Sequence, residues 1–247
     1  MRILFLTDLH SAHGYLAPLI EREQEVDLVL LGGDITSFGS AAHAKAMIEP
    51  LLSSFPVVRS VHGNVDLPGV LPWLEERGLS LHGRGEAIDG VGFFGCGGSN
   101  FTPMHTPTEY SEAAIEDLLE RGLDCVRHAE PKVLVCHCPP RDTALDRMFA
   151  GKNVGSTSLR DFLSREPVTL CLCGHIHEAV GTERVGDALV VNPGSFCTGR
   201  YALIHLEGKD VRADLRRLPL RRRQQIRTTA EVWSAKIVGF ARHRLGS

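Results

Sequence analysis

Two short motifs in the chain each contain a pair of residues whose side chains can bind metal. The two residues of each pair are two positions apart. The first contains Asp8 and His10, the second contains His175 and His177, and each follows an apolar run. Residues two apart in an extended segment point to the same side, so each pair can address one ion. An isolated Asp-x-His is more often a polar turn, whereas Gly-His-x-His is a stronger indication of a metal site.

Three further polar residues follow apolar runs in the same way. Two glycines precede Asp34, Gly63 precedes Asn64, and His137 directly ends its run. Each alone is typical of an ordinary turn, but five chain segments that all end in a suitable donor are improbable as unrelated turns. Oxygen and nitrogen donors without thiolate suit manganese, iron or zinc better than calcium. The pattern therefore predicts a transition-metal site.

The apolar runs that precede these residues must position them. The runs are typical of short strands buried on both faces. They span residues 3–6, 26–31, 57–61, 133–136 and 169–173. Helical periodicity at residues 15–23 and 40–49 separates the first three runs, which predicts a β-α-β-α-β order and an α/β fold. Ligands of such sheets bind at the carboxyl ends of the strands, where all of these donors fall.

The remaining chain has a different pattern. Short runs punctuated by glycine at residues 86–95, 183–191 and 201–206 predict antiparallel hairpins joined to a mixed sheet. We expect one domain over residues 1–210 and an arginine-rich, partly helical C-terminal extension over residues 211–247. Three roles of the extension stay open, namely phosphate binding, contact with a neighbouring subunit in a homo-oligomer, and no role beyond that of a solvated helix. The solvated helix is the default.

One long loop, at residues 95–108, contains too many glycines and prolines for a regular element. Long loops in compact domains are often functional. We expect this loop to border the metal site and to help select substrate through Asn100 and Phe101, with a compact structural loop as the alternative. A helix is predicted behind it, from about residue 111 to residue 120.

Composition excludes several classes of protein. The chain has 247 residues, of which 43% are hydrophobic and 23% charged, which suits one large α/β domain. Its net charge of -3 provides no general attraction to nucleic acid or to an anionic membrane. No apolar stretch is long enough to span a membrane, and no signal segment precedes the first run. We therefore expect a soluble protein that has no membrane partner.

The cysteines argue against a disulfide framework, because the chain has seven of them. Cys136 and Cys138, like Cys171 and Cys173, are spaced by two on predicted strands, so each pair points to one face. They are best interpreted as small apolar fillers, and a structural zinc site would favour a Cys-x2-Cys spacing that is absent here. Reduced cysteines predict a cytoplasmic location.

The chain resembles the calcineurin-like metallophosphoesterases over roughly residues 1–207. The signature of that family consists, in order, of Asp-x-His, Gly-Asp, Gly-Asn, His and Gly-His-x-His, and this chain contains the same motifs in the same order. The resemblance implies a four-layered α/β/β/α sandwich of two mixed sheets. It implies that one divalent metal ion is held by Asp8, His10 and His177, and a second by Asn64, His137 and His175. Asp34 would bridge the two ions, and Asp34, Asn64 and His137 would be catalytic.

The chemistry of two adjacent cations is hydrolysis of a phosphate ester by a hydroxide that bridges them. In the commonest family pattern Gly-Asn is followed by a histidine that protonates the leaving oxygen, but this chain has Val65. His62, Asp66 and His105 are candidate replacements, although each also fits a purely structural position, such as a loop histidine or a helix N-cap. Without such an acid, esters with poor leaving groups should react slowly.

The favoured function is therefore a phosphodiesterase acting on a small or nucleotide-like phosphate ester. A phosphomonoesterase is the weaker alternative, because dianionic monoesters with alkoxide leaving groups depend more on a general acid. A nuclease of the same fold stays open, although the acidic main domain lacks the basic face that a nucleic-acid partner favours. A metal-binding interaction scaffold without catalysis is the last alternative, and the complete ligand set argues against it.

Overall fold

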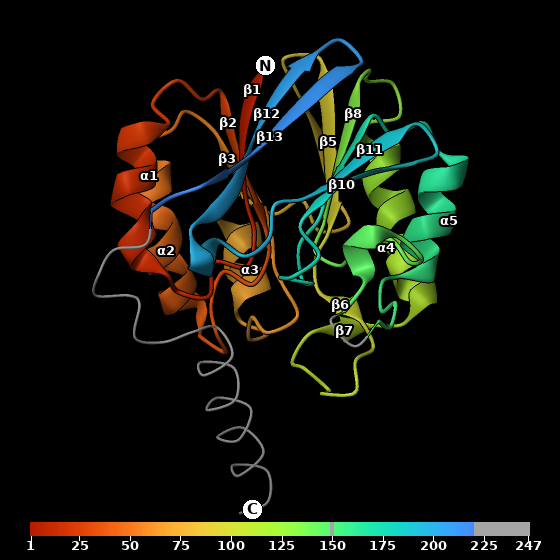
Figure 1. Ribbon diagram of the computed structural model, residues 1–247, viewed down its shortest axis with the longest axis horizontal. Helices are drawn as coiled ribbons and strands as arrows, with labels where there is room; N and C mark the ends of the chain where they lie inside the picture. Colours follow the sequence, from red (N-terminus) through yellow and green to blue (C-terminus); the bar gives the residue numbers. More distant parts are fainter. Residues whose placement is uncertain (149–150, 220–247) are drawn as a thin grey trace, which may run out of the picture.

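The computed structural model describes residues 1–148 and 151–219. Within them the chain forms two large mixed sheets that face each other (Figure 1). The first sheet has the order β13 (Asp210–Arg217), β12 (Arg200–Glu207), β1 (Arg2–Leu6), β2 (Leu28–Gly32) and β3 (Val58–Val61). The second has the order β10 (Gly181–Val185), β11 (Ala188–Asn192), β9 (Leu170–Leu172), β8 (Lys132–Cys136), β5 (Val91–Cys96) and β4 (Gly85–Ile88).

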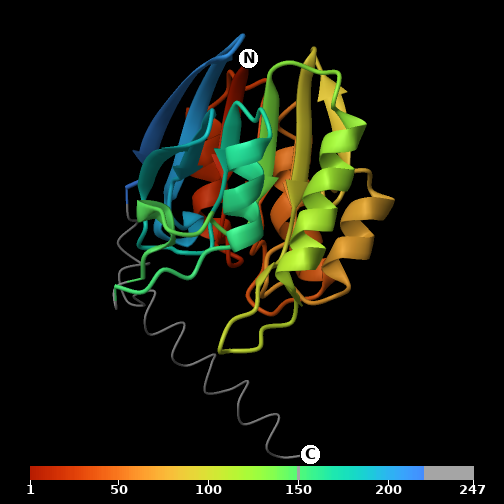
Figure 2. The same ribbon diagram turned by 90° about the vertical axis from the view of Figure 1, so that its right-hand side faces the viewer.

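Helices cover the outer face of each sheet. The first sheet is covered by α1 (Leu16–Arg22), α2 (Ala41–Leu52) and α3 (Val70–Glu76). The second is covered by α4 (Glu112–Cys125) and α5 (Thr157–Arg165), which lie side by side in Figure 2. The short elements are the strands β6 (Ser99–Asn100) and β7 (Glu109–Tyr110) and the 3-10 turns His13–Tyr15, Ala144–Asp146 and Phe196–Thr198. The result is the four-layered α/β/β/α sandwich that the resemblance implies.

The strands β1, β2, β3 and β12 of the first sheet each contribute to two apolar cores. In β1, Leu4 and Leu6 pack on the helices, whereas Phe5 faces the second sheet and joins a cluster with Val135 and Leu172. This confirms that the apolar runs are strands buried on both faces. Each fully buried side chain of this size stabilises the fold by about 1.5–3 kcal/mol. The two sheets therefore form a rigid support for the loops at their edges.

Strand directions agree with the predicted order. The strands β1, β2 and β3 are parallel, and so are β5, β8, β9 and β11. The hairpins β4–β5, β10–β11 and β12–β13 confirm the antiparallel prediction. The strand β1 also pairs antiparallel with β12, in a register that places Arg2 opposite His205. The two ends of the described chain thus meet in one sheet.

Some of the helices and strands predicted from the sequence agree with the structure, and others do not. The helix expected behind the long loop is α4, in which the Ser111 hydroxyl accepts a hydrogen bond from the amide of Ala114. The helices α3 and α5 have no counterpart in the prediction. Residues 211–217 of the predicted extension lie in β13, so the sheet continues beyond the expected boundary at residue 210. Residues 220–247, including the predicted helical part of the extension, lie outside the described residues.

The cysteines of the second sheet confirm their interpretation as apolar fillers. Cys136, Cys138, Cys171 and Cys173 are buried among the apolar side chains between that sheet and its helices. A separate observation concerns membranes: none of the helices in the described ranges is both long and apolar enough to cross a bilayer.

Candidate metal centre

The predicted metal ligands all follow the carboxyl ends of strands, and these strand ends lie at one edge of the sandwich, the lower edge in Figure 1. The ligands follow the carboxyl ends of β1, β2, β3, β8 and β9 and are Asp8, His10, Asp34, Asn64, His137, His175 and His177. Strands from both sheets therefore contribute. The parallel directions of these strands bring the loops after them to the same place.

The backbone of these loops is unusual. Asp8, His10, Asp34 and His175 have positive φ angles of 53°, 46°, 47° and 67°. Such a conformation is costly for residues other than glycine, and it persists where the surrounding structure imposes it. Here the loops hold one another, because the Asp8 amide donates to the Gly33 carbonyl oxygen (3.0 Å) and the His10 amide donates to the Asp34 carbonyl oxygen (2.9 Å).

The first ligand loop is also held by a segment from far along the chain. The Ser195 hydroxyl donates to the Asp8 carbonyl oxygen at 2.7 Å, and the Cys197 amide donates to the same oxygen at 3.2 Å. The Phe196 amide donates to the Thr7 carbonyl oxygen at 2.9 Å. The turn before β12 thus fixes the loop after β1.

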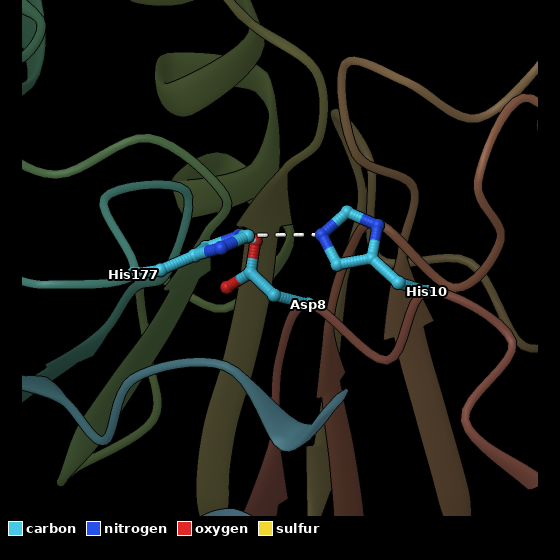
Figure 3. Close-up of side chains that lie close together, drawn as sticks. All are labelled: Asp8, His10 and His177. Carbon is cyan, nitrogen blue, oxygen red and sulfur yellow. Dashed lines mark hydrogen bonds and ion pairs between the residues drawn. The ribbon is translucent and has the colours of Figure 1, made fainter. Parts of the chain in front are cut away.

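Asp8, His10 and His177, called here the Asp8 group, converge in the first half of the centre (Figure 3). The Nε2 atom of His177 lies 3.2 Å from Asp8 Oδ1 and 3.2 Å from His10 Nε2. The Asp8 carboxylate also accepts hydrogen bonds from the Thr7 hydroxyl and the His175 amide. One carboxylate oxygen and two imidazole nitrogens therefore point at a common space.

Asn64, His137 and His175, called here the Asn64 group, form the second half. Asn64 Oδ1 lies 3.0 Å from His137 Nε2 and 2.9 Å from His175 Nδ1. On the other side of its ring, His137 places Nδ1 2.7 Å from the Gly32 carbonyl oxygen, so Nδ1 is a donor. In the neutral imidazole, Nε2 then carries a lone pair directed at the Asn64 oxygen. Two acceptors in this arrangement need a cation or a proton between them.

Asp34 lies between the two groups. Its Oδ2 atom is 3.8 Å from His10 Nε2, and its Oδ1 atom is 3.5 Å from His137 Nε2. The Val65 amide donates to Oδ1 at 3.0 Å and fixes the carboxylate. Gly63 lies so close to this carboxylate that a Cβ atom there would overlap it, which explains the glycine. The two oxygens of Asp34 thus face opposite halves of the centre.

The pKa values of the metal-free protein show that the centre attracts positive charge. Burial alone would raise the pKa of Asp8, but the charge and hydrogen bond of His177 hold it well below its usual range. Burial opposes protonation of His137, yet Asp34 raises the pKa of that imidazole to about 10. Burial lowers the pKa of His10 to about 4. Two buried carboxylates among histidines favour a cation in this space.

The donor set fits divalent transition metals. Asp8, His10 and His177 place ligand atoms within 4.8 Å of one another, and so do Asp8, Asp34 and His137. Carboxylate oxygen, amide oxygen and imidazole nitrogen suit manganese, iron and zinc. Hydrogen bonds orient both the Asp8 carboxylate and the His137 ring, as is usual for metal ligands.

Hydrogen bonds to neighbouring loops fix the side chain of Asp66, one of the predicted proton donors. Its carboxylate accepts hydrogen bonds from the amides of Ile35 (3.1 Å), Thr36 (2.8 Å) and Gly63 (2.9 Å) and from the Thr36 hydroxyl (2.7 Å). Burial and the charge of Asp34 nevertheless raise the pKa of Asp66 to about 6. Asp66 links the loops after β2 and β3 and so positions Asp34.

The two histidines among those candidates lie in different surroundings. His62 is buried, its Nε2 atom is 3.3 Å from the Tyr110 hydroxyl oxygen, and its ring packs against His82 with centroids 4.6 Å apart. His105 is exposed on the long loop, with its backbone amide bonded to the Thr102 carbonyl oxygen. Proton donation by any of the three stays a prediction.

The long loop contacts the Asn64 group. The Asn64 amide donates from Nδ2 to the Thr106 hydroxyl oxygen at 2.9 Å, and the Thr108 amide donates to the Asn64 carbonyl oxygen at 3.1 Å. Phe101 is 69% exposed, and Asn100 donates to the Val154 carbonyl oxygen. The loop therefore lies beside the centre, and its role in substrate selection stays a prediction. Sequence reasoning missed Thr106, because nothing in the sequence distinguishes it from the other threonines of the loop.

Comparisons with known proteins agree with this geometry. The sequence model described as calcineurin-like phosphoesterase matches residues 1–179. An uncharacterized protein of Methanocaldococcus jannaschii is 36% identical over 200 residues, which cover 78% of this chain and 88% of the relative.

Solved structures share the fold at lower identity. The protein TT1561 of Thermus thermophilus has a TM-score of 0.70 at 19% identity, covering 86% of this chain and 97% of that one. A dimetal phosphatase from Danio rerio has a TM-score of 0.61 at 12% identity, covering 86% of this chain and 98% of that one. The matched sequence, the sandwich and the convergent ligands lead to one conclusion: the chain belongs to the calcineurin-like phosphoesterase family, whose members bind two divalent metal ions.

Proposed function

We propose that the protein is a phosphodiesterase that hydrolyses a small or nucleotide-like phosphodiester with two divalent metal ions. The Asp8 group would hold one ion, the Asn64 group would hold the other, and Asp34 would serve both. The positions of the two Asp34 oxygens, 3.8 Å from His10 Nε2 and 3.5 Å from His137 Nε2, support this assignment. When bound, such a pair of ions binds phosphate oxygens and lowers the pKa of a water that attacks phosphorus.

The chain's own residues keep the ligands in place and screen charge. The two buried carboxylates, Asp8 and Asp34, offset the charge of the cations. The Gly32 carbonyl oxygen fixes the His137 tautomer so that Nε2 presents its lone pair to the metal. Asp66 holds the loops that carry Asp34 and Asn64 at a fixed separation.

The preference for diesters rests on one observation, the buried Val65 that directly follows Asn64. A valine cannot protonate a departing oxygen. Asp66, the next residue, accepts hydrogen bonds from two loops with both of its carboxylate oxygens. Substrates whose leaving groups depart without a proton are therefore favoured, whereas alkyl phosphomonoesters depend most on the missing acid.

A series of aryl methyl phosphodiesters with phenols of increasing pKa tests the proposal. The wild-type protein, loaded in turn with Mn²⁺, Zn²⁺ and Fe²⁺, should show kcat/KM values that fall steeply as the pKa of the phenol rises. An alkyl phosphomonoester should react far more slowly than the aryl diesters. Protein treated with a chelator is the control. Equal rates for alkyl monoesters and aryl diesters would show that another residue already acts as the acid.

Restoring the acid gives a second test of the role of Val65. Val65→His should flatten the dependence on leaving-group pKa if the imidazole reaches the leaving oxygen. Because Val65 is buried, Val65→Phe is the matched control for added bulk. A flatter dependence in both variants would mean that a change in packing, and not the imidazole, is responsible.

A further inference from the structure

Thr106 lies between a proposed metal ligand and a carboxylate. Its hydroxyl oxygen accepts a hydrogen bond from Asn64 Nδ2 at 2.9 Å and donates to Glu109 Oε1 at 2.5 Å. Thr106 and Asn64 are 42 residues apart in sequence, and the contact joins the long loop to the loop after β3. Three side chains thus form a chain that ends at the metal centre.

The number of protons in this chain determines the direction of each hydrogen bond. An ionised carboxylate can only accept, so the single proton of the Thr106 hydroxyl is used for Glu109. The hydroxyl oxygen then has only lone pairs to offer Asn64, and these require the NH₂ end of the amide. The Oδ1 end must consequently face the other way, where it lies 3.0 Å from His137 Nε2 and 2.9 Å from His175 Nδ1.

Glu109 is held firmly enough to impose this order. Besides the Thr106 hydroxyl, its carboxylate accepts hydrogen bonds from the Thr106 amide at 2.7 Å, the Thr102 hydroxyl at 2.6 Å and the Thr102 amide at 3.2 Å. Burial raises its pKa, but these hydrogen bonds outweigh burial and lower the pKa below its usual value. The carboxylate therefore stays ionised near neutral pH and remains an acceptor.

We propose that Thr106 and Glu109 are positioning residues that set the amide of Asn64, so that its oxygen and not its nitrogen is presented to the second metal ion. The inference rests on the proposed assignment of the Asn64 group to that ion. An amide turned by 180° would place NH₂ hydrogens toward the cation and could not act as a ligand. The long loop thereby controls the affinity of one of the two metal sites.

Titration of the metal-free protein with Mn²⁺, followed by calorimetry and by the electron paramagnetic resonance signal of coupled Mn²⁺ pairs, tests the proposal. Thr106→Val removes the acceptor of the Asn64 amide. The affinity for the second Mn²⁺ should fall by about 10–100-fold, as is typical when a residue that orients a ligand is lost. Binding of the first Mn²⁺ should be unchanged. The coupled-pair signal should weaken accordingly at a fixed Mn²⁺ concentration.

Two variants provide matched controls. Thr102→Val removes a hydroxyl that donates to the same Glu109 oxygen but does not touch Asn64, so it should weaken the second Mn²⁺ much less than Thr106→Val does. Thr106→Ser retains the hydroxyl and should restore the affinity. The thermal midpoint of each metal-free variant shows that the fold is intact. Glu109→Gln replaces a group that can only accept by an amide that can also donate, so the Thr106 proton is no longer required there and the second ion should bind more weakly as well.

The outcomes separate the inference from the function on which it rests. The positioning role would be overturned if Thr106→Val lost affinity for both ions equally, or if Thr106→Val and Thr102→Val lost the same affinity for the second ion. In either case, Mn²⁺ pairs in the wild type would still support the metal assignment. A wild-type protein that binds only one Mn²⁺ would overturn the assignment itself, and the positioning role with it. Selective weakening of the second ion, with rescue by Thr106→Ser, would support the inference.

Discussion

The two halves of the proposed metal centre are built by different means. The Asp8 group contains its own carboxylate, and that carboxylate lies 3.2 Å from the His177 nitrogen. The Asn64 group consists of an amide and two imidazoles, and its geometry depends on hydrogen bonds to the Gly32 carbonyl oxygen and the Thr106 hydroxyl. Charge attracts a cation over a range of orientations, whereas a dipole must point correctly. The binding of a cation by the neutral half should therefore depend more on the hydrogen bonds that set the orientation of its ligands.

The largest expected effect comes from Asp34, the residue that the two halves are proposed to share. Asp34→Asn removes the charge between them and should weaken both Mn²⁺ sites, each by more than about 100-fold, because loss of a ligand exceeds loss of a residue that orients one. Hydrolysis of an aryl phosphodiester should fall with occupancy. The exposed Asp161→Asn on α5 is the control for charge. If Asp34→Asn lost only one ion, the halves would not share this residue.

The next effect separates the halves. Asp8→Asn keeps the shape of the side chain but removes the carboxylate charge, so it should release the first ion and leave the second. Asn64→Ala should do the reverse. Calorimetric titration with Mn²⁺ distinguishes the two patterns, and we expect Asp8→Asn to cost more affinity because it removes a charge. Identical losses from the two variants would contradict the distinction between a charged and a neutral half.

A third effect concerns how acid changes the stability of the fold around His82, which lies behind the Asn64 group. His82 packs on His62 and accepts a hydrogen bond from the Gly97 amide at 2.9 Å, at the start of the long loop. Burial, with a smaller contribution from Arg121, lowers the pKa of His82 from 6.5 to about 4. As pH falls through this window, the unfolded chain gains a proton that the folded protein does not, so the free energy of unfolding decreases.

Chemical denaturation of the metal-free protein at pH 7.5 and pH 4.5 measures this change. The His82 contribution should be at most about 3 kcal/mol. His82→Gln keeps an acceptor for the Gly97 amide but cannot titrate, so its stability should decrease less over the same interval. Parallel pH profiles for the wild type and His82→Gln would exclude His82 as the origin.

The smallest effect is expected at the outer part of the long loop. Replacing Asn100 and Phe101 by alanine should change kcat/KM among diesters with different leaving groups by severalfold, because Phe101 is 69% exposed and can contact a substrate. Mn²⁺ stoichiometry should stay at the wild-type value. Unchanged kinetics on every diester would mean that this part of the loop is structural only, unlike Thr106.

Residues next to strands are predictable from sequence, and residues that act across the fold are not. Asp8, Asp34 and His137 follow apolar runs, so the strand ends alone are enough to locate them. Thr106 contacts Asn64 only because a loop without periodicity folds back across 42 residues. In the sequence Asp66 fits a helix N-cap or a proton donor, yet its carboxylate bonds Thr36, 30 residues earlier.

Helices and boundaries escape prediction for local reasons. The helix α3, Val70–Glu76, is only seven residues long and contains a proline, too short for a clear helical period. The strand β13 alternates charged and apolar residues at the sheet edge, and its arginines favour the interpretation as a separate extension. Composition indicates where a chain changes character, but pairing with β12 decides where the sheet ends.

The pairing of β1 with β12, together with the turn at Ser195, has a consequence for how the protein is made. A ribosome delivers Asp8 and His10 first, but some of the hydrogen bonds that fix their loop come from the turn at Ser195, which is 187 residues after Asp8. Nascent protein therefore carries metal-binding side chains well before it can hold them in place. We expect metal to enter only after the Ser195 turn and β12 have been synthesised and have paired, so that availability of the ion at that moment determines which metal is acquired.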